Sequence, residues 1–145
     1  MKTEIFFSSE NGVWETPQKL FDELNEEFDF GIDVCALPEN AKCEKYYTPE
    51  HDGLRQPWVG NVWCNPPYGR GIERWLEKAQ KSVTEGAKVV VMLLPVRTNT
   101  KWFHEYIYNK AEIRFIRGKL KFSNHKDPAP FPSMLAIFRA KEEEK

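Results

Sequence analysis

Cysteine is scarce in this chain, and the few cysteines lack the spacing of a cysteine-based site. Three are present, Cys35, Cys43 and Cys64, and no two of them form a Cys-x-x-Cys pair. An odd number without that spacing indicates neither a disulfide framework nor a zinc centre. His51 and His104 do not stand at ligand spacing from any cysteine either. No metal site is therefore predicted.

Long apolar runs and an excess of charge of either sign are also missing. No stretch could span a bilayer, and Met1-Lys2-Thr3-Glu4 leads into only a short apolar patch, so we expect no signal peptide and a cytoplasmic protein. With 21 basic and 22 acidic residues the net charge is −1. Dedicated nucleic-acid binders are usually basic, so any contact with nucleic acid must come from a local patch.

The composition that remains is that of a globular protein. Of 145 residues, 41% are hydrophobic and 14% aromatic, which is enough for one core. We expect a single domain over residues 1–140 and a solvated charged tail over residues 141–145.

Apolar periodicity predicts an α/β fold. Thr16 and Pro17 are placed as N-cap and first residue of a helix that ends near Glu27, and further helices are predicted over 71–83 and 100–109. Strands are predicted over 28–36, 45–47, 61–65, 88–94 and 111–116, with an antiparallel hairpin of 119–122 and 133–139 at the end. The alternation predicts a trimmed Rossmann-like sheet, mostly parallel, with a C-terminal antiparallel hairpin.

The most informative motif is Asn65-Pro66-Pro67-Tyr68, which follows the short apolar run 61–64. Two prolines cannot donate ladder hydrogen bonds, so the motif is a rigid loop at the carboxyl end of a strand, where α/β sheets place their chemistry. The Asn65 side-chain oxygen and the Pro66 carbonyl can each accept a hydrogen from a planar amino group, and Tyr68 offers a ring face for stacking. An isolated Pro-Pro-Tyr is otherwise a common turn.

Other short segments occur in a recognisable order along the chain. They are Trp14-Glu15-Thr16-Pro17, Asp33-Val34-Cys35-Ala36, Asn40-Ala41-Lys42, Asp52-Gly53-Leu54, Trp58, Ile72-Glu73-Arg74-Trp75, Leu94-Pro95-Val96-Arg97-Thr98 and Arg117-Gly118-Lys119-Leu120-Lys121-Phe122.

With these segments the chain resembles class I S-adenosylmethionine-dependent methyltransferases, and more narrowly the short phage and prophage DNA adenine-N6 methyltransferases of the Dam type. The resemblance runs from Trp14 to Phe138. It departs from the broader pattern after the first strand, where Asp33-Val34-Cys35-Ala36 replaces a Gly-x-Gly turn. Ala36 is small enough to permit close approach of the backbone.

The resemblance implies an enzyme that methylates adenine N6 in double-stranded DNA with S-adenosyl-L-methionine, after flipping the base out of the duplex. It implies catalytic roles for Asn65, Pro66, Pro67 and Tyr68. The residues implied at the cofactor are Trp14, Thr16, Pro17, Asp33, Cys35, Ala36, Asp52 and Asn65.

For DNA we expect a patch of basic residues in loops near the catalytic edge, with phosphate contacts that hold the duplex, and a homodimer on a palindromic target is an open possibility. The residues expected at DNA are Arg70, Arg97, Lys101, Lys119, Lys121 and Phe122, with His125 and Lys126 beside them.

Several alternatives stay open at the level of sequence. Asp33 could cap a strand end, Asp52-Gly53 could be an ordinary turn, and Phe122 could be a core aromatic. The same motif geometry would serve a protein glutamine amide or a ribosomal RNA guanine amine. A non-catalytic DNA-binding module on the same fold is the third interpretation.

Overall fold

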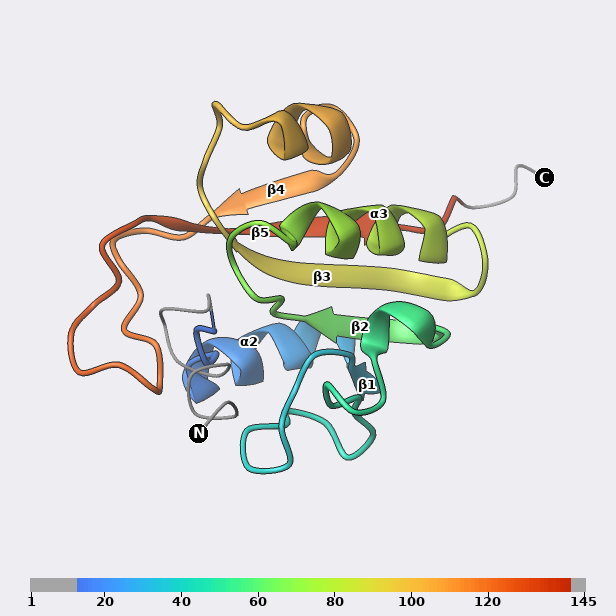
Figure 1. Cartoon of the computed structure of the whole chain (residues 1–145), viewed down its shortest axis with the longest axis horizontal. Coiled ribbons are helices and arrows are strands. Elements are labelled where there is room, and N and C mark those ends of the chain that lie inside the picture. The colour runs from blue at the N-terminus through green and yellow to red at the C-terminus, as the bar shows by residue number, and fades with distance from the viewer. Residues whose placement is uncertain (1–12, 142–145) are drawn as a thin grey trace.

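A five-stranded sheet forms the centre of the protein in the computed structural model, which describes residues 13–141 (Figure 1). The spatial order of the strands is β1-β2-β3-β5-β4. β1, β2 and β3 run parallel, and β5 is antiparallel to both β3 and β4, so β5 is the one reversed strand of this sheet. The strands are β1 (Ile32–Asp33), β2 (Gly60–Cys64), β3 (Ala87–Pro95), β4 (Glu112–Phe115) and β5 (Ser133–Arg139).

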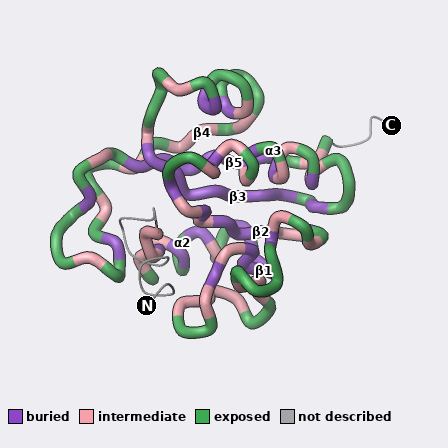
Figure 2. Tube along the Cα trace, viewed as in Figure 1, coloured by how far each residue is buried: buried purple, intermediate pink, exposed green. Residues whose placement is uncertain are grey.

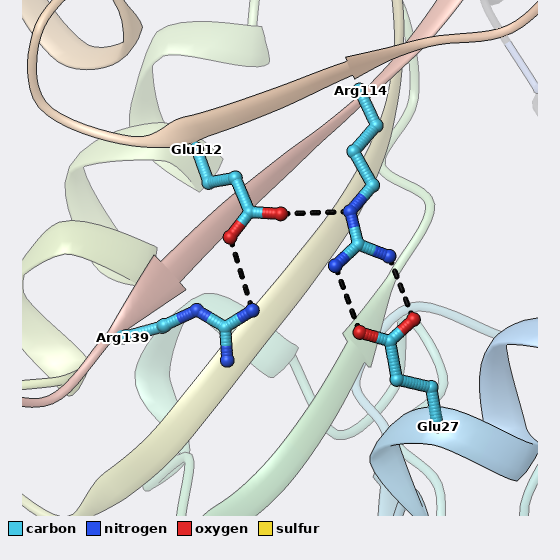
Figure 3. A network of polar contacts seen from close by, with 4 residues as sticks. All are labelled: Glu27, Glu112, Arg114 and Arg139. Carbon is cyan, nitrogen blue, oxygen red and sulfur yellow. Dashed lines mark hydrogen bonds and ion pairs between the residues drawn. The ribbon is translucent and has the colours of Figure 1, made fainter.

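Two α-helices cover opposite faces of the sheet. α3 (Ile72–Ser82) lies over β3 and β5 on the viewer's side of Figure 1, and α2 (Gln18–Phe28) lies in front of the sheet in the reverse view of Figure 3. Phe21 of α2 packs edge-on against Trp63 of β2, with ring centroids 5.5 Å apart. Layers on both faces explain why β3 is buried almost throughout (Figure 2), as its continuous apolar sequence predicts.

A polar network joins the end of α2 to the far edge of the sheet (Figure 3). Arg114 of β4 donates two hydrogen bonds to Glu27, at 2.7 and 2.8 Å, and its Nε donates to Glu112 at 2.7 Å. Arg139 of β5 donates to Glu112 at 3.0 Å, and both guanidinium groups lie within 5.6 Å of the Phe28 ring centre. The bidentate pair links the last turn of α2 to the β4–β5 hairpin.

The strands at the start of the sheet are shorter than predicted. The strand expected over 28–36 is reduced to Ile32–Asp33, because Asp29 adopts a left-handed conformation (φ 50°) that closes α2. The strand expected over 45–47 is a single parallel bridge between Tyr46 and Asp33. The Val34 amide still donates to the Trp63 carbonyl of β2 at 3.1 Å, whereas the Ala36 amide donates to the Tyr47 carbonyl at 3.0 Å, so the predicted strand leaves β2 after Val34.

The C-terminal hairpin has a different first strand from the one predicted. β4 pairs with β5, and residues 119–122 form no strand. The chain there turns toward the N-terminal segment, where the Ser123 amide donates to the Glu15 carbonyl at 2.9 Å. The helix expected over 100–109 is a short π-helix, η3 (Phe103–Ile107), in place of a regular α-helix. The predicted tail lies outside the described residues, except for Lys141.

Candidate functional site

A cavity of about 210 Å³ opens at the carboxyl ends of β1 and β2. Parallel strands bring these ends to one edge of the sheet, so Asp33, the last residue of β1, and Asn65, directly after β2, share the cavity. Three loop segments complete its wall, residues 13–16, 34–42 and 47–53. The lining residues are Val13, Trp14, Glu15, Thr16, Asp33, Val34, Cys35, Ala36, Leu37, Asn40, Lys42, Tyr47, Thr48, Pro49, Asp52, Gly53, Trp63, Asn65, Pro66, Pro67 and Trp75.

The side chain of Asn65 is held in one orientation. Its Nδ2 donates to the Trp14 carbonyl and, at 3.0 Å, to the Thr16 hydroxyl. Because a carbonyl can only accept, the amide nitrogen must face Trp14 and the oxygen Oδ1 must face the other way. Oδ1 is buried and has no hydrogen-bond partner among the described residues. A buried acceptor without a partner is costly, and it is placed to receive a donor from a ligand.

The two prolines lie beside Asn65 as the sequence predicts, whereas Tyr68 lies behind them. Pro66 and Pro67 line the cavity; Tyr68 does not. Tyr68 is 9% exposed, and its hydroxyl donates to the Leu93 carbonyl of β3 at 3.1 Å. Its ring meets Phe131 edge-on at 5.8 Å. The motif therefore lines the cavity with Asn65, Pro66 and Pro67 and is anchored to the sheet through Tyr68.

Asp33 is a buried carboxylate on the floor of the cavity. Its two oxygens accept the backbone amides of Cys35 (3.2 Å) and Lys42 (3.0 Å). Burial raises the pKa of Asp33 from 3.8 to about 6, although these amides and the charge of Lys42 lower it. The alternative of a strand-end cap and a role in the cavity are thus both compatible with its position.

We expect the raised pKa of Asp33 to make stability fall as pH rises from about 4 to about 6. The folded state holds the proton of Asp33 more tightly than the unfolded state, so the protonated group stabilises the fold most below pH 3.8, its unfolded pKa. This stabilisation is lost as the pH rises through about 6, its folded pKa. A rise in the pKa of Asp33 from 3.8 to about 6 corresponds to about 3 kcal/mol of folding free energy. Urea unfolding of the wild type and Asp33→Asn from pH 4 to 8 measures it. The prediction would be contradicted if the free energy of unfolding of the wild type increased relative to that of Asp33→Asn as the pH rises.

Gly53 allows the loop 47–53 to pack on the end of β1. A Cβ at this position would lie 2.3 Å from the Val34 carbonyl oxygen. The Gly53 carbonyl accepts from Trp58 Nε1 at 2.8 Å, which anchors the loop from the other side. Asp52 precedes it with φ 56°, and its carboxylate lies 3.3 Å from exposed Arg55. The Asp52-Gly53 turn is therefore part of the cavity wall.

The structure brings together most of the residues predicted at a cofactor. Trp14, Thr16, Asp33, Cys35, Ala36, Asp52 and Asn65 all line the cavity, and Pro17 does not. Thr16 does not cap the helix as predicted: the N-cap is Pro17, without a side-chain hydrogen bond, and the Thr16 hydroxyl serves Asn65 instead. Burial raises the pKa of the Cys35 thiol, so it lines the cavity in its neutral form.

Sequence reasoning assigned no role to several cavity residues. Asn40 and Lys42 fall in one of the segments on which the family resemblance rests, and Trp75 falls in another. The resemblance could therefore have indicated these three residues. Lys42 donates to Gln18 at 2.8 Å, and burial lowers its pKa. Nothing in the local sequence indicated Tyr47 or Thr48 as cavity residues. The backbone of Tyr47 binds Asp33 (2.9 Å) and Ala36 (3.0 Å), and these hydrogen bonds bring the segment to the cavity.

The residues expected at DNA divide into two kinds. Arg70, Arg97, Lys101, Lys119 and Lys121 are all exposed. Phe122 is fully buried, against Trp14 and Tyr68, so the core alternative describes it and its assignment to a DNA-contacting surface was wrong. Lys101 lies 3.6 Å from Glu105, and Lys121 donates to the His125 carbonyl at 2.9 Å.

Neither a membrane-spanning helix nor a metal-binding cluster is found among residues 13–141. No helix in this range is both long and apolar enough to cross a membrane. No group of three or more His, Cys, Asp or Glu side chains in the same range is arranged to hold a metal ion.

Comparison with known proteins identifies relatives over nearly the whole chain. Residues 5–145 match the family model described as DNA N-6-adenine-methyltransferase (Dam). The DNA N-6-adenine-methyltransferase of Haemophilus phage HP1 (strain HP1c1) is 34% identical over 142 residues, covering 92% of this chain and 82% of the relative. The DNA N-6-adenine-methyltransferase of Escherichia phage T1 is 36% identical over 111 residues, covering 74% of this chain but only 46% of that relative. The putative methyltransferase YfdM of Escherichia coli (strain K12) is 36% identical over 63 residues, covering 38% and 69%.

Proposed function

The chain belongs to the DNA N-6-adenine-methyltransferase (Dam) family, and from that premise we propose that it methylates adenine N6 in double-stranded DNA with S-adenosylmethionine, using Asn65 and Pro66 to hold the amine. As a member of the family it is an adenine-N6 methyltransferase. The observation that carries the proposed mechanism is the buried, unpartnered Oδ1 of Asn65.

The cavity fits S-adenosylmethionine by the chemistry of its lining. Asp33 and Asp52 supply carboxylates for an ammonium group and for hydroxyl or amino donors, and each Asp33 oxygen has a lone pair beyond its backbone contact. Trp75 and Pro49 add apolar surface for a purine ring. When bound, the cofactor supplies an electrophilic methyl group on a sulfonium centre.

Asn65 and Pro66 would hold the target amine through its two hydrogens. An aromatic amine is a poor nucleophile because its lone pair is delocalised into the ring. Acceptance of one hydrogen by Asn65 Oδ1 and of the other by the Pro66 carbonyl favours a tetrahedral nitrogen whose lone pair points away from the ring. Both bonds strengthen as positive charge grows on nitrogen, so they act mainly on the transition state. The methylated amine is then a strong acid and needs no strong base.

The base must leave the duplex to reach Asn65. We propose that Tyr68 stacks on the flipped adenine, as its place after Pro67 suggests. Because Tyr68 is 9% exposed, the base must displace Phe131, the half-buried ring that meets Tyr68 edge-on. The exposed guanidinium of Arg97, 6.0 Å from the Phe131 ring centre, lies next to that entry.

Mass spectrometry of digested DNA tests the proposed reaction. The purified chain, incubated with S-adenosylmethionine and duplex DNA, is expected to produce N6-methyladenine that depends on both. Calorimetry is expected to detect cofactor binding without added metal. No binding at millimolar cofactor, with or without DNA, would overturn the proposal. Methyl transfer to protein or RNA but not to DNA would favour the other acceptors.

DNA binding is expected to be electrostatic and to depend on the basic loop residues. A small domain neutralises few phosphates, so the slope of log affinity against log salt should be about −3 to −5. Replacing both Lys119 and Lys121 with alanine should reduce the slope by up to about 2. Lys81→Ala/Lys88→Ala, exposed near the amino end of β3 and away from the cavity, is the matched control. Fluorescence anisotropy measures the slope for the wild type and for both double variants. Equal slopes for the wild type and Lys119→Ala/Lys121→Ala would favour DNA contacts at Arg70 and Arg97 instead. The homodimer stays a prediction.

A further inference from the structure

Two residues in the connection between β4 and β5, Ser123 and Asn124, hold the segment 13–16 by four hydrogen bonds. Asn124 Oδ1 accepts the Glu15 amide at 2.9 Å, and Asn124 Nδ2 donates to the Val13 carbonyl at 3.1 Å. The Ser123 amide donates to the Glu15 carbonyl at 2.9 Å, and its hydroxyl to the Thr16 carbonyl at 3.2 Å. Residues 13–16 belong to no helix or strand, so these bonds replace a regular ladder.

The segment held in this way supplies both acceptors of the Asn65 amide. They are the Trp14 carbonyl and the Thr16 hydroxyl. Asn124 contacts the residues on either side of Trp14, 111 and 109 positions away in sequence. The ring of Trp14 is stacked on His125, with centroids 4.0 Å apart. The direction of the Trp14 carbonyl therefore depends on the loop that carries Asn124.

We propose that Asn124 is a positioning residue for Asn65. By hydrogen bonding to the residues on both sides of Trp14 it fixes the direction of Asn65 Oδ1. The inference rests on the proposed function in so far as Oδ1 accepts the target amine. Ser123 and Asn124 are exposed, so their bonds contribute modestly to the stability of the fold. Their effect on rate is larger, because a catalytic group displaced by about 1 Å can cost up to ~10²-fold.

The two hydrogen bonds of Asn124 to segment 13–16 require an amide side chain of this length. Asn124 must accept from one backbone group and donate to another at the same time, which neither aspartate nor alanine can do. Asn124→Asp keeps the bond from the Glu15 amide but places a carboxylate oxygen against the Val13 carbonyl. Asn124→Ala loses both bonds.

Steady-state kinetics at saturating cofactor and DNA measure the effect. Asn124→Ala is expected to lower kcat about 10- to 30-fold, and Asn124→Asp to lower it by a similar factor. Asn25→Ala is the matched control: it removes an asparagine that accepts a backbone amide (Phe30, 2.8 Å) at the end of α2, and its kcat should stay within about twofold of the wild type. In an Asn65→Ala background, Asn124→Ala should cost no further factor. A full additional loss there would overturn the inference.

The side-chain amide of Asn65 gives a second readout that needs no activity. Its pair of ¹H–¹⁵N resonances, assigned by their loss in Asn65→Asp, should show slow hydrogen exchange in the wild type. Exchange is expected to accelerate in Asn124→Ala and to stay slow in Asn25→Ala. Unchanged exchange in Asn124→Ala would overturn the inference. A wild type that does not methylate DNA would overturn the proposed function, while the exchange data would still decide the positioning.

Discussion

Replacement of Asn65 with alanine is expected to lower the turnover number at least ~10²-fold, with cofactor affinity and fold nearly unchanged. The substitution removes Oδ1, a buried acceptor that has no hydrogen-bond partner among residues 13–141 and belongs to a residue lining the cavity. By analogy with a lost oxyanion-hole donor, such a group acts mainly in the transition state. Single-turnover methyl transfer to duplex DNA measures the loss, and cofactor titration checks binding.

Asn65→Asp is expected to be nearly as inactive, although a carboxylate is a stronger acceptor than an amide. One carboxylate oxygen would face the Trp14 carbonyl, where Nδ2 now donates, and two acceptors repel each other. Asn61→Ala is the matched control, since Asn61 Nδ2 also donates to two carbonyls, those of Phe28 and Asp29, at the amino end of β2. It should lose stability and keep its turnover. Near-normal turnover in Asn65→Ala would mean that residues 65–68 are only a turn.

Gly53→Ala is expected to weaken cofactor binding at least ~10-fold and to cost about 2–3 kcal/mol of stability. The new Cβ would lie 2.3 Å from the Val34 carbonyl oxygen, which is backbone and cannot rotate away. The loop 47–53 must then move off the end of β1, although Trp58 holds the Gly53 carbonyl. Asp52 and Pro49 would leave their places in the cavity wall.

Gly31→Ala is the control for this substitution. Gly31 precedes β1, has no positive φ, and would place its Cβ 3.9 Å from its nearest neighbour, the Asn61 carbonyl oxygen. Alanine there should be neutral or stabilise by up to about 1 kcal/mol, because it restricts the unfolded chain. Calorimetric titration of S-adenosylmethionine and urea unfolding measure both variants. Equal affinities in Gly53→Ala and Gly31→Ala would show that the close packing of the loop has no bearing on cofactor binding.

Gly53 packs against the segment that stands where the broader pattern has a glycine-rich turn after the first strand. In the sequence, Asp33-Val34-Cys35-Ala36 stands at that point, with Ala36 as its smallest residue. In the fold, a glycine from a distant loop reaches the Val34 carbonyl. Sequence reasoning could see Asp52-Gly53 only as a turn, because the contact that requires a glycine lies on another segment.

The sequence by itself determined the parts of this protein that depend on local chemistry. The apolar run of β3 predicted a strand buried on both faces, and two prolines after β2 predicted a rigid loop at a strand's carboxyl end. Residue type alone also indicated that Asn65 and Pro66 could accept hydrogens from an amine. Local preferences and hydrogen-bonding capacity belong to each residue, so they can be inferred without knowing its neighbours.

Only the tertiary structure decided which partners those residues meet. Thr16 has the chemistry of a helix cap, yet its hydroxyl binds Asn65, because the two approach each other across 49 positions of sequence. Residues 119–122 have the composition of a strand, yet the chain that follows them binds segment 13–16. Partner choice depends on which donors and acceptors the packed sheet brings within about 3 Å, and that proximity is a property of the whole chain.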